Sequence, residues 1–204
     1  MSSITAVLPT SPLQAVAAMF RRLTVDQYHQ MIQTGILADG EAVELLEGYL
    51  VNKMAHNNPH RLGVQWLGKR LHMLGLSGWV VLTQLPITLA DSEPEPDGCL
   101  ARGDDRTYLT RHPGPGDVGL VVEVADSSLA FDRIHKGRIY AREGIPSYWI
   151  VNVADRLIEV YTDPDPAADP PAYRNRTDYH PGDTVPIVLD GQPAGSIAVA
   201  DLIP

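Results

Sequence analysis

Short apolar runs and helical spacings of apolar residues divide the chain into strands and helices. Residues 118–124 form a β-branched run between turn residues, which predicts a buried strand. Apolar residues recur at three- and four-residue intervals from about 60 to 74, which predicts a helix with one inward face. A second helix is expected after the cap residues 126–128, and it should run to about Arg142 and stop at Gly144. Together these elements predict an α/β protein.

The other segments predict one more helix and several hairpins. Thr24 is expected to cap a helix, because Gln27 three residues later completes a capping box, and Gly35 ends that helix. Prolines, glycines and acidic residues predict irregular loops over 102–116 and 163–171. Strands are expected at 42–46, 49–54, 79–89, 147–153, 157–161, 172–176 and 185–189, and the ending 197–202 should dock back on the fold.

Length and composition predict one domain with a short arm. The 204 residues are ample for a hydrophobic core. Residues 1–22 hold prolines and small residues and are expected to form a flexible N-terminal arm, which leaves 23–204 as the domain. No apolar run is long enough to cross a membrane, and the first residues lack the pattern of a signal peptide. Cys99 is the only cysteine, which excludes an internal disulfide, so a cytoplasmic location is expected.

The formal net charge of −9 limits the classes of partner. Affinity for DNA rests largely on the neutralisation of phosphates, so the charge argues against a broad nucleic-acid-binding surface. A local basic groove beside an acidic site is still compatible with it. Arg133, Arg138 and Arg142 make the second helix locally basic, and this helix is therefore the best candidate for an element that faces phosphate.

Two carboxylates and one lysine stand in otherwise apolar or helical surroundings. Glu123 falls near the end of the 118–124 strand, where a lone carboxylate is costly unless it is paired or bound to a cation. Asp97 lies in a proline-flanked extended segment. If they converge, the two carboxylates predict a site for Mg²⁺, with Mn²⁺ as its substitute. Lys136 beside them would hold a phosphate or help to deprotonate water, which indicates metal-assisted hydrolysis of a phosphodiester.

These residues, together with segments before and after them, resemble the PD-(D/E)XK nuclease superfamily and, within it, the Uma-type restriction endonuclease family. The resemblance covers most of the chain, and the order and spacing of its pieces make it specific. One position departs from the pattern, because the superfamily's lysine would fall where this chain has Ala125. The matching pieces are residues 23–28, 43–48, His60, 95–97, 121–124, Asp132, Arg133, Lys136, Tyr140 and 148–151.

The resemblance implies a restriction-endonuclease-like core, in which helices flank a central mixed β-sheet. An extra N-terminal helix and hairpin and extra C-terminal strands would be added to this core. The resemblance also implies that Lys136, on the helix after the Glu123 strand, replaces the lysine that is missing at position 125. It further implies DNA as the substrate, a homodimer as the assembly, and no membrane partner.

On this interpretation, Asp97 and Glu123 hold the metal together with the main-chain carbonyl of Val124. Lys136 orients the attacking water or stabilises the negative charge that develops on phosphorus. The alternative for Lys136 is a surface ion pair with Asp132, which lies four residues earlier on the same helix face.

Glu44 and His60 are expected to take secondary roles. Glu44 and Glu47 lie three residues apart, so a strand points them to opposite faces and only one can easily face the site. Glu44 matches the family's acidic position and is therefore expected to be a further metal-site or water-positioning acid, and a solvated strand glutamate is its alternative. His60 projects from the inward face of the 60–74 helix, where it would reach substrate phosphate or the metal-bound water. The alternative for His60 is a structural residue that caps a turn.

The sequence therefore predicts a Mg²⁺-dependent DNA endonuclease, and two other functions remain open. One is a catalytically weak nucleic-acid-binding or regulatory module with the same fold, which the acidic charge favours. The other is a hydrolase of small phosphodiesters or nucleotides, which would need no extended basic surface.

Overall fold

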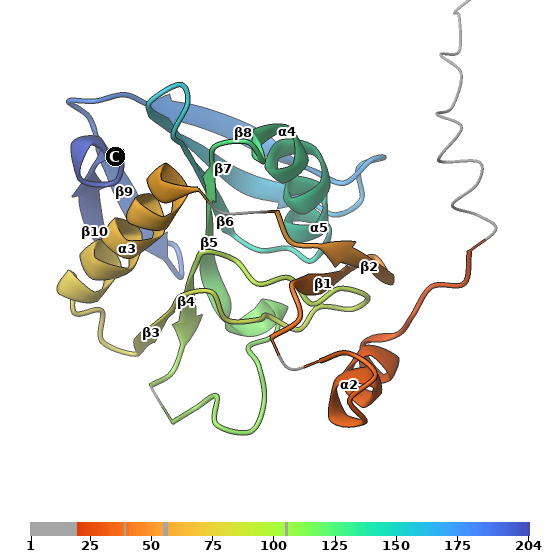
Figure 1. Ribbon diagram of the computed structural model, residues 1–204. Helices are drawn as coiled ribbons and strands as arrows, with labels where there is room; N and C mark the ends of the chain where they lie inside the picture. The colour runs from red at the N-terminus through yellow and green to blue at the C-terminus, as the bar shows by residue number, and fades with distance from the viewer. Residues whose placement is uncertain (1–19, 39, 55–56, 105) are drawn as a thin grey trace, which may run out of the picture.

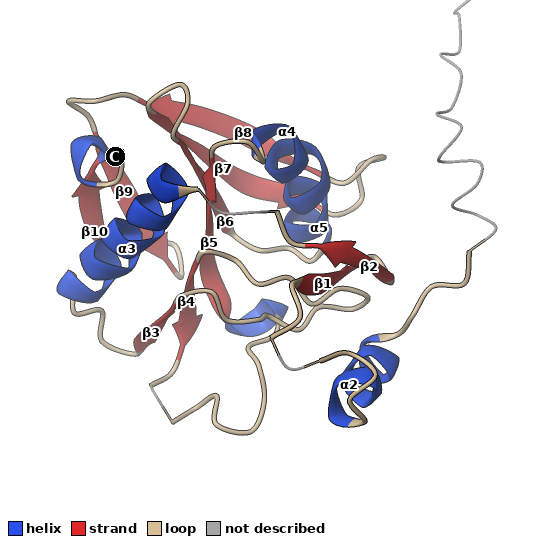
Figure 2. Ribbon diagram, in the orientation of Figure 1, coloured by secondary structure: helices blue, strands red, loops and turns tan. Residues whose placement is uncertain are grey.

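A twisted six-stranded sheet forms the centre of the computed structural model, which describes residues 20–38, 40–54, 57–104 and 106–204 (Figures 1 and 2). Along the sheet the strands follow chain order. Strands β5 and β6 are parallel and the other neighbours are antiparallel, so the predicted mixed sheet is confirmed. The strands are β3 (Trp79–Leu82), β4 (Gly98–Arg102), β5 (Val118–Ala125), β6 (Ser147–Asn152), β7 (Leu157–Asp165) and β8 (Ala172–Tyr179).

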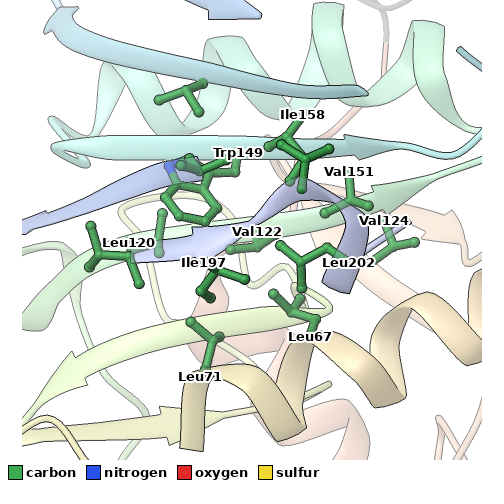
Figure 3. Packing of buried hydrophobic residues seen from close by; sticks show 14 of the residues in the cluster. Leu67, Leu71, Leu120, Val122, Val124, Trp149, Val151, Ile158, Ile197 and Leu202 are labelled. Atoms are coloured by element: carbon green, nitrogen blue, oxygen red, sulfur yellow. The ribbon is translucent and has the colours of Figure 1, made fainter. Parts of the chain in front are cut away.

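One face of the sheet is covered by apolar packing. Helix α3 (Asn58–Met73) lies on it beside the antiparallel hairpin of β9 (Thr184–Leu189) and β10 (Gln192–Ala198). Figure 3 shows side chains of α3, the central strands and the C-terminal segment meeting in this core. Its labelled members are Leu67, Leu71, Leu120, Val122, Val124, Trp149, Val151, Ile158, Ile197 and Leu202.

The opposite face is covered by the connection between the two parallel strands, which we call the crossover helix. It consists of α4 (Leu129–Phe131), a π-helical turn (Asp132–Lys136) and α5 (Gly137–Arg142). Ile139 and Tyr140 of this helix are buried with Val121 and Tyr148 of the sheet. Because this face holds polar groups as well as apolar ones, it is the face that can build a site.

Two N-terminal elements border the crossover-helix face. Strands β1 (Val43–Leu46) and β2 (Tyr49–Asn52) form the predicted antiparallel hairpin. Helix α2 (Val25–Gln33) begins at the predicted capping box, in which Thr24 and Gln27 exchange side-chain and backbone hydrogen bonds. Tyr28 of α2 packs against Leu37 and Leu45, which anchors this helix to β1.

Alternation along β5 decides which face each of its side chains reaches. Val122 and Val124 belong to the core under α3, whereas Val121 and Ala125 belong to the core under the crossover helix. Successive strand residues point to opposite faces, so Glu123 points toward the crossover helix. Ala125 is fully buried on that same face, so position 125 contributes apolar packing and no charge.

Several predicted boundaries differ from the structure. The strand expected over 79–89 ends at Leu82, because the chain leaves the sheet before Pro86. The loop expected over 163–171 is shorter, since β7 continues to Asp165 and pairs with β8 even through Pro164. Pairing with a neighbouring strand has overridden the local loop signal of proline and aspartate in this segment. Strand β10 was not predicted, although Val199 and the residues after it do dock on the core.

The predicted N-terminal arm lies almost wholly outside the described residues, which begin at Phe20. Near the start of the described chain, the guanidinium of Arg22 lies 5.4 Å from the ring centroid of Tyr49, and the amide of Leu23 donates to the carbonyl of Gly48 at 2.9 Å. Among the helices of the described ranges, none combines the length and the apolar character that crossing a membrane requires.

Packing at Gly119 gives a test of the fold. A Cβ atom at this position on β5 would lie 2.6 Å from the ring of Trp79 and 2.7 Å from Leu189. We expect Gly119→Ala to lower the free energy of unfolding by about 1–3 kcal/mol, as overpacking of a core does. Gly116→Ala is the matched control, because its Cβ would meet no heavy atom within 4 Å. Chemical denaturation measures both, and equal stability of the two variants would contradict this packing.

Candidate active site

A cavity of about 340 Å³ lies where the adjoining ends of β4 and β5 meet the crossover helix, the β1–β2 hairpin and the start of α3. Asparagine, glutamine and serine side chains contribute neutral polar groups to its wall. Among the described residues that line it, carboxylates outnumber ammonium groups by six to two. The ammonium groups belong to Lys53 and Lys136. The carboxylates belong to Glu44, Glu95, Asp97, Glu123, Asp126 and Asp132.

Asp97 is held rigidly at the entrance to β4. Its Oδ2 accepts a hydrogen bond from the amide of Val124 at 2.9 Å and lies 3.0 Å from Nε2 of His60. The side-chain amide of Gln84 donates to Oδ1 of Asp97 at 3.5 Å. The antiparallel pairing of Gly98 with Val122 brings Asp97 beside the end of β5, so the predicted convergence of the two acids does occur at one cavity.

Glu123 and Lys136 form a buried ion pair. The ammonium of Lys136 donates to Oε1 of Glu123 at 3.0 Å, and the hydroxyl of Tyr140 donates to the same oxygen at 2.8 Å. Only 3% of Glu123 and 8% of Lys136 is exposed. The lysine therefore reaches the end of β5 from the crossover helix. This contact rules out the alternative of a surface ion pair with Asp132.

Burial and mutual repulsion alter the charge of these groups. Burial raises the pKa of Glu123, and the nearby carboxylates of Asp97, Asp132 and Glu44 add to this effect, whereas the ammonium of Lys136 opposes it and favours the ionised carboxylate that pairs with it. Burial alone would lower the pKa of Lys136, but the surrounding carboxylates outweigh burial and raise it. Lys136 therefore carries a positive charge at neutral pH, and three acidic side chains, those of Glu123, Glu44 and Asp132, act on this one ammonium.

Glu44 faces the cavity as predicted, whereas Glu47 lies in the turn after β1, where strand alternation does not apply. Glu44 is buried and lines the cavity, where Oε1 lies 3.8 Å from Nζ of Lys136 and Oε2 accepts from the amide of Glu95 at 3.2 Å. Glu47 lies in the hairpin turn and forms ion pairs with Arg138 and Arg142 of the crossover helix. The solvated alternative for Glu44 is therefore wrong, and Glu47 connects the hairpin to the helix instead of facing the cavity.

His60 lies in the first turn of α3, which is capped by Asn57. The side-chain oxygen of Asn57 accepts from the amide of His60 at 3.1 Å, so the cap is Asn57 and not the histidine. Only 8% of His60 is exposed, and its ring contacts the carboxylate of Asp97. This contact suits a residue that orients Asp97. A role toward phosphate or water stays a prediction.

Asp132 is a site residue whose place in the cavity wall was not predicted. It lies 3% exposed in the wall, and Oδ2 accepts from the hydroxyl of Ser128 at 2.6 Å. The main chain makes a π-helical turn here, and the amide of Gly137 donates to the carbonyl of Asp132 five residues earlier. Such turns often occur at functional sites. The four-residue spacing from Lys136 placed both residues on one face, but it did not reveal that this face is buried.

The three arginines of the crossover helix have carboxylate partners. Arg133 donates to Glu159, which is fully buried, with Nε 2.9 Å from Oε2. Arg138 and Arg142 both contact Glu47. The helix therefore offers phosphate less unneutralised positive charge than its sequence predicted.

Comparisons with known proteins identify a family and agree with the fold. The family model Uma2, described as "Putative restriction endonuclease", matches residues 25–198. A crystal structure described as a "putative nuclease belonging to DUF820" from Anabaena variabilis is similar, with a TM-score of 0.60 and 13% sequence identity. The alignment covers 88% of this chain and 97% of that chain, and at this identity it concerns the fold alone. No curated protein sequence matches significantly.

Asp132 gives a test of the electrostatics through pH. Burial raises its pKa from 3.8 to about 6, although Lys136 and the Ser128 hydroxyl oppose the shift. A raised pKa in the folded state stabilises the protein at low pH, and that stabilisation is lost as the pH rises from about 4 to about 6. Relative to Asp132→Asn, the wild type should therefore lose on the order of 1–3 kcal/mol over this window. Denaturation in metal-free buffer measures this, and parallel pH curves would contradict the raised pKa.

Proposed function

The chain belongs to the Uma2 family, and from this membership and the contents of the cavity we propose that it is a divalent-metal-dependent nuclease that hydrolyses phosphodiester bonds in DNA. The observation that carries the proposal is the meeting of Asp97, Glu123 and Lys136 at one buried cavity. A metal ion, a phosphate and a water molecule each find groups there that would hold them.

The residues present fit a hard cation. Asp97 and Glu123 offer carboxylate oxygens, and the main-chain carbonyl of Val124 is the third ligand that we assign. Oxygen ligands of this kind suit Mg²⁺ and Mn²⁺. The chemistry of the donor set supports the assignment, because Glu44 and Asp132 add further negative charge that a single lysine does not balance. A divalent cation would offset this repulsion.

The metal and Lys136 would divide the catalytic work. A bound divalent cation stabilises charge on phosphoryl oxygens and makes water a better nucleophile at neutral pH. Lys136 places its ammonium against the same phosphate, where it stabilises the negative charge that develops in the transition state. Because its neighbours raise its pKa, Lys136 stays protonated and does not act as the base.

Two further residues would position these groups. His60 and the amide of Val124 fix the carboxylate of Asp97 in one orientation. Glu44 lies 3.8 Å from the ammonium of Lys136, which also contacts Glu123, and would limit the directions in which the ammonium can point. Both residues therefore act through another group, and neither is required to touch the phosphate.

A hydrolase of small phosphodiesters or nucleotides is the second candidate. The pairing of Arg133 and Arg138 with carboxylates favours it, since those arginines then contribute little attraction for a long polyanion. A cavity of about 340 Å³ is large enough for a small ligand. Cleavage of DNA measured beside cleavage of a small chromogenic phosphodiester separates the two candidates. A regulatory module would cleave neither.

Metal binding is tested by thermal stability. Mg²⁺ or Mn²⁺ at one hundred times its dissociation constant should stabilise the folded protein by about 2.7 kcal/mol, which raises Tm by several degrees. Asp97→Asn should lose most of this rise, although it keeps an oxygen that can accept from the amide of Val124. Asp26→Asn, which removes an exposed carboxylate on α2, is the control and should keep the full rise. An unchanged rise in Asp97→Asn would overturn the metal assignment.

Lys136 is tested by kinetics. Lys136→Met keeps most of the aliphatic stem and should slow cleavage by roughly 30- to 1,000-fold, which corresponds to about 2–4 kcal/mol of transition-state stabilisation. The Tm rise caused by Mg²⁺ should persist, because an ammonium is not a metal ligand. Lys69→Met removes an exposed lysine of α3 and should cleave at the wild-type rate. If Lys136→Met also cleaves at that rate, its catalytic role is wrong.

A further inference from the structure

A second group of metal-ligand side chains lies outside the cavity described above. It consists of His29 on α2, Glu93 in the segment before β4 and His112 in the loop after β4. One ligand atom from each residue lies within 4.8 Å of the other two. The three side chains thus come from three separate parts of the chain and converge on one point.

The distances match those around a small transition-metal ion. Nε2 of His29 lies 2.8 Å from Oε2 of Glu93, and Nδ1 of His112 lies 3.5 Å from the same oxygen. A tetrahedral ion with bonds of about 2.0–2.1 Å places its ligand atoms roughly 3.3 Å apart. The observed distances lie on either side of that value, so shifts of side chains alone would admit an ion.

The surroundings supply both order and access. Glu93 is 3% exposed, its amide donates to the carbonyl of Leu45 at 2.6 Å, and the hydroxyl of Thr88 donates to Oε2 at 2.6 Å. A hydroxyl that orients a ligating carboxylate in this way is typical of metal sites. The imidazoles are more accessible, with 35% of the His29 side chain and 40% of the His112 side chain exposed. A cavity of about 720 Å³ opens beside them and leaves room for a water ligand.

One cation lines this cavity and could oppose an incoming metal ion, but its charge is already compensated. The guanidinium of Arg111 donates to both carboxylate oxygens of Asp117, at 2.6 Å and 3.2 Å. Among the described residues, the carboxylate of Glu93 forms ion pairs with His29 and His112 and with no arginine. When the two imidazoles are neutral, as metal ligation requires, the negative charge of Glu93 is available to a cation.

We propose that His29, Glu93 and His112 form a Zn²⁺ site with a water molecule in the fourth position. Two imidazoles and one carboxylate suit Zn²⁺ far better than Mg²⁺, which prefers oxygen ligands. Zinc bound there clamps α2 and the loop after β4 onto the segment that leads to Asp97. The site does not depend on the proposed nuclease activity, because Glu93 and Asp97 line different cavities.

The experiment is a titration of the full chain, first stripped with a chelator, with Zn²⁺ in competition with a chromogenic chelator. The wild type should bind one tight equivalent, and zinc should raise its Tm. His29→Ala and His112→Ala should each weaken that equivalent at least about 100-fold, since even residues that merely orient a ligand contribute 10- to 100-fold. Because the side chain of His112 is exposed, His112→Ala should fold normally. Circular dichroism checks this expectation.

Two control variants make the result specific to this site. His180→Ala removes an exposed imidazole elsewhere, and Asp97→Asn alters the other cavity. Both should bind zinc as the wild type does. The proposal is overturned if the stripped wild type binds no zinc tightly, because the three residues are then joined only by hydrogen bonds and ion pairs. It is also overturned if His112→Ala binds zinc normally, or if Asp97→Asn loses the tight equivalent.

Discussion

Glu123 is a carboxylate near the C-terminal end of a buried strand, and its ion pair with Lys136 connects the central sheet to the crossover helix. An unpaired charge in this position would cost several kcal/mol, whereas the pair with an added hydrogen bond from Tyr140 makes burial tolerable. Alternation along β5 leaves the glutamate no other face. The ion pair between Glu123 and Lys136 therefore contributes both to the docking of the crossover helix and to the formation of the site.

The two faces of the sheet have different tasks. The face under α3 is an apolar core, in which Leu67, Leu71 and Trp149 are almost completely buried. The other face combines apolar packing with carboxylates, and burial, with a smaller contribution from their mutual repulsion, raises the pKa of Glu123 and Asp132. Arrangements of this kind destabilise a protein locally and are found where a ligand is to be bound. The apolar core on one face of the sheet thus stabilises a fold whose other face holds the buried acidic groups.

Local patterns in the sequence carried enough information for the central elements. The capping box at Thr24 and the β-branched run of β5 are both local signals, and the structure agrees with each. The family resemblance was needed to choose Lys136, because Ala125 stands where the superfamily's lysine would be. The contact of Lys136 with Glu123 then agreed with that choice.

The features that could not be predicted from the sequence depend on contacts between residues that are distant in the chain. The buried position of Asp132 depends on a π-helical turn and on how the helix docks, and neither leaves a spacing signal. The compensation of Arg133 by Glu159 joins residues 26 positions apart. The length of β7 is set by its pairing with β8, which overrides the turn residues near Pro164. The His29–Glu93–His112 group likewise appears only once three distant segments meet.

Strand order along the central sheet follows chain order, and this has a consequence for how the molecule folds. Strand β6 can pair with β7, and β7 with β8, through short loops, and contacts between near neighbours form quickly. The parallel pair of β5 and β6 is different, because it must wait for the whole crossover connection to pack. A partly folded chain that holds only its antiparallel hairpins would already have much of its sheet. It would lack the lysine beside Glu123, so assembly of the sheet and acquisition of the site are separable events in time.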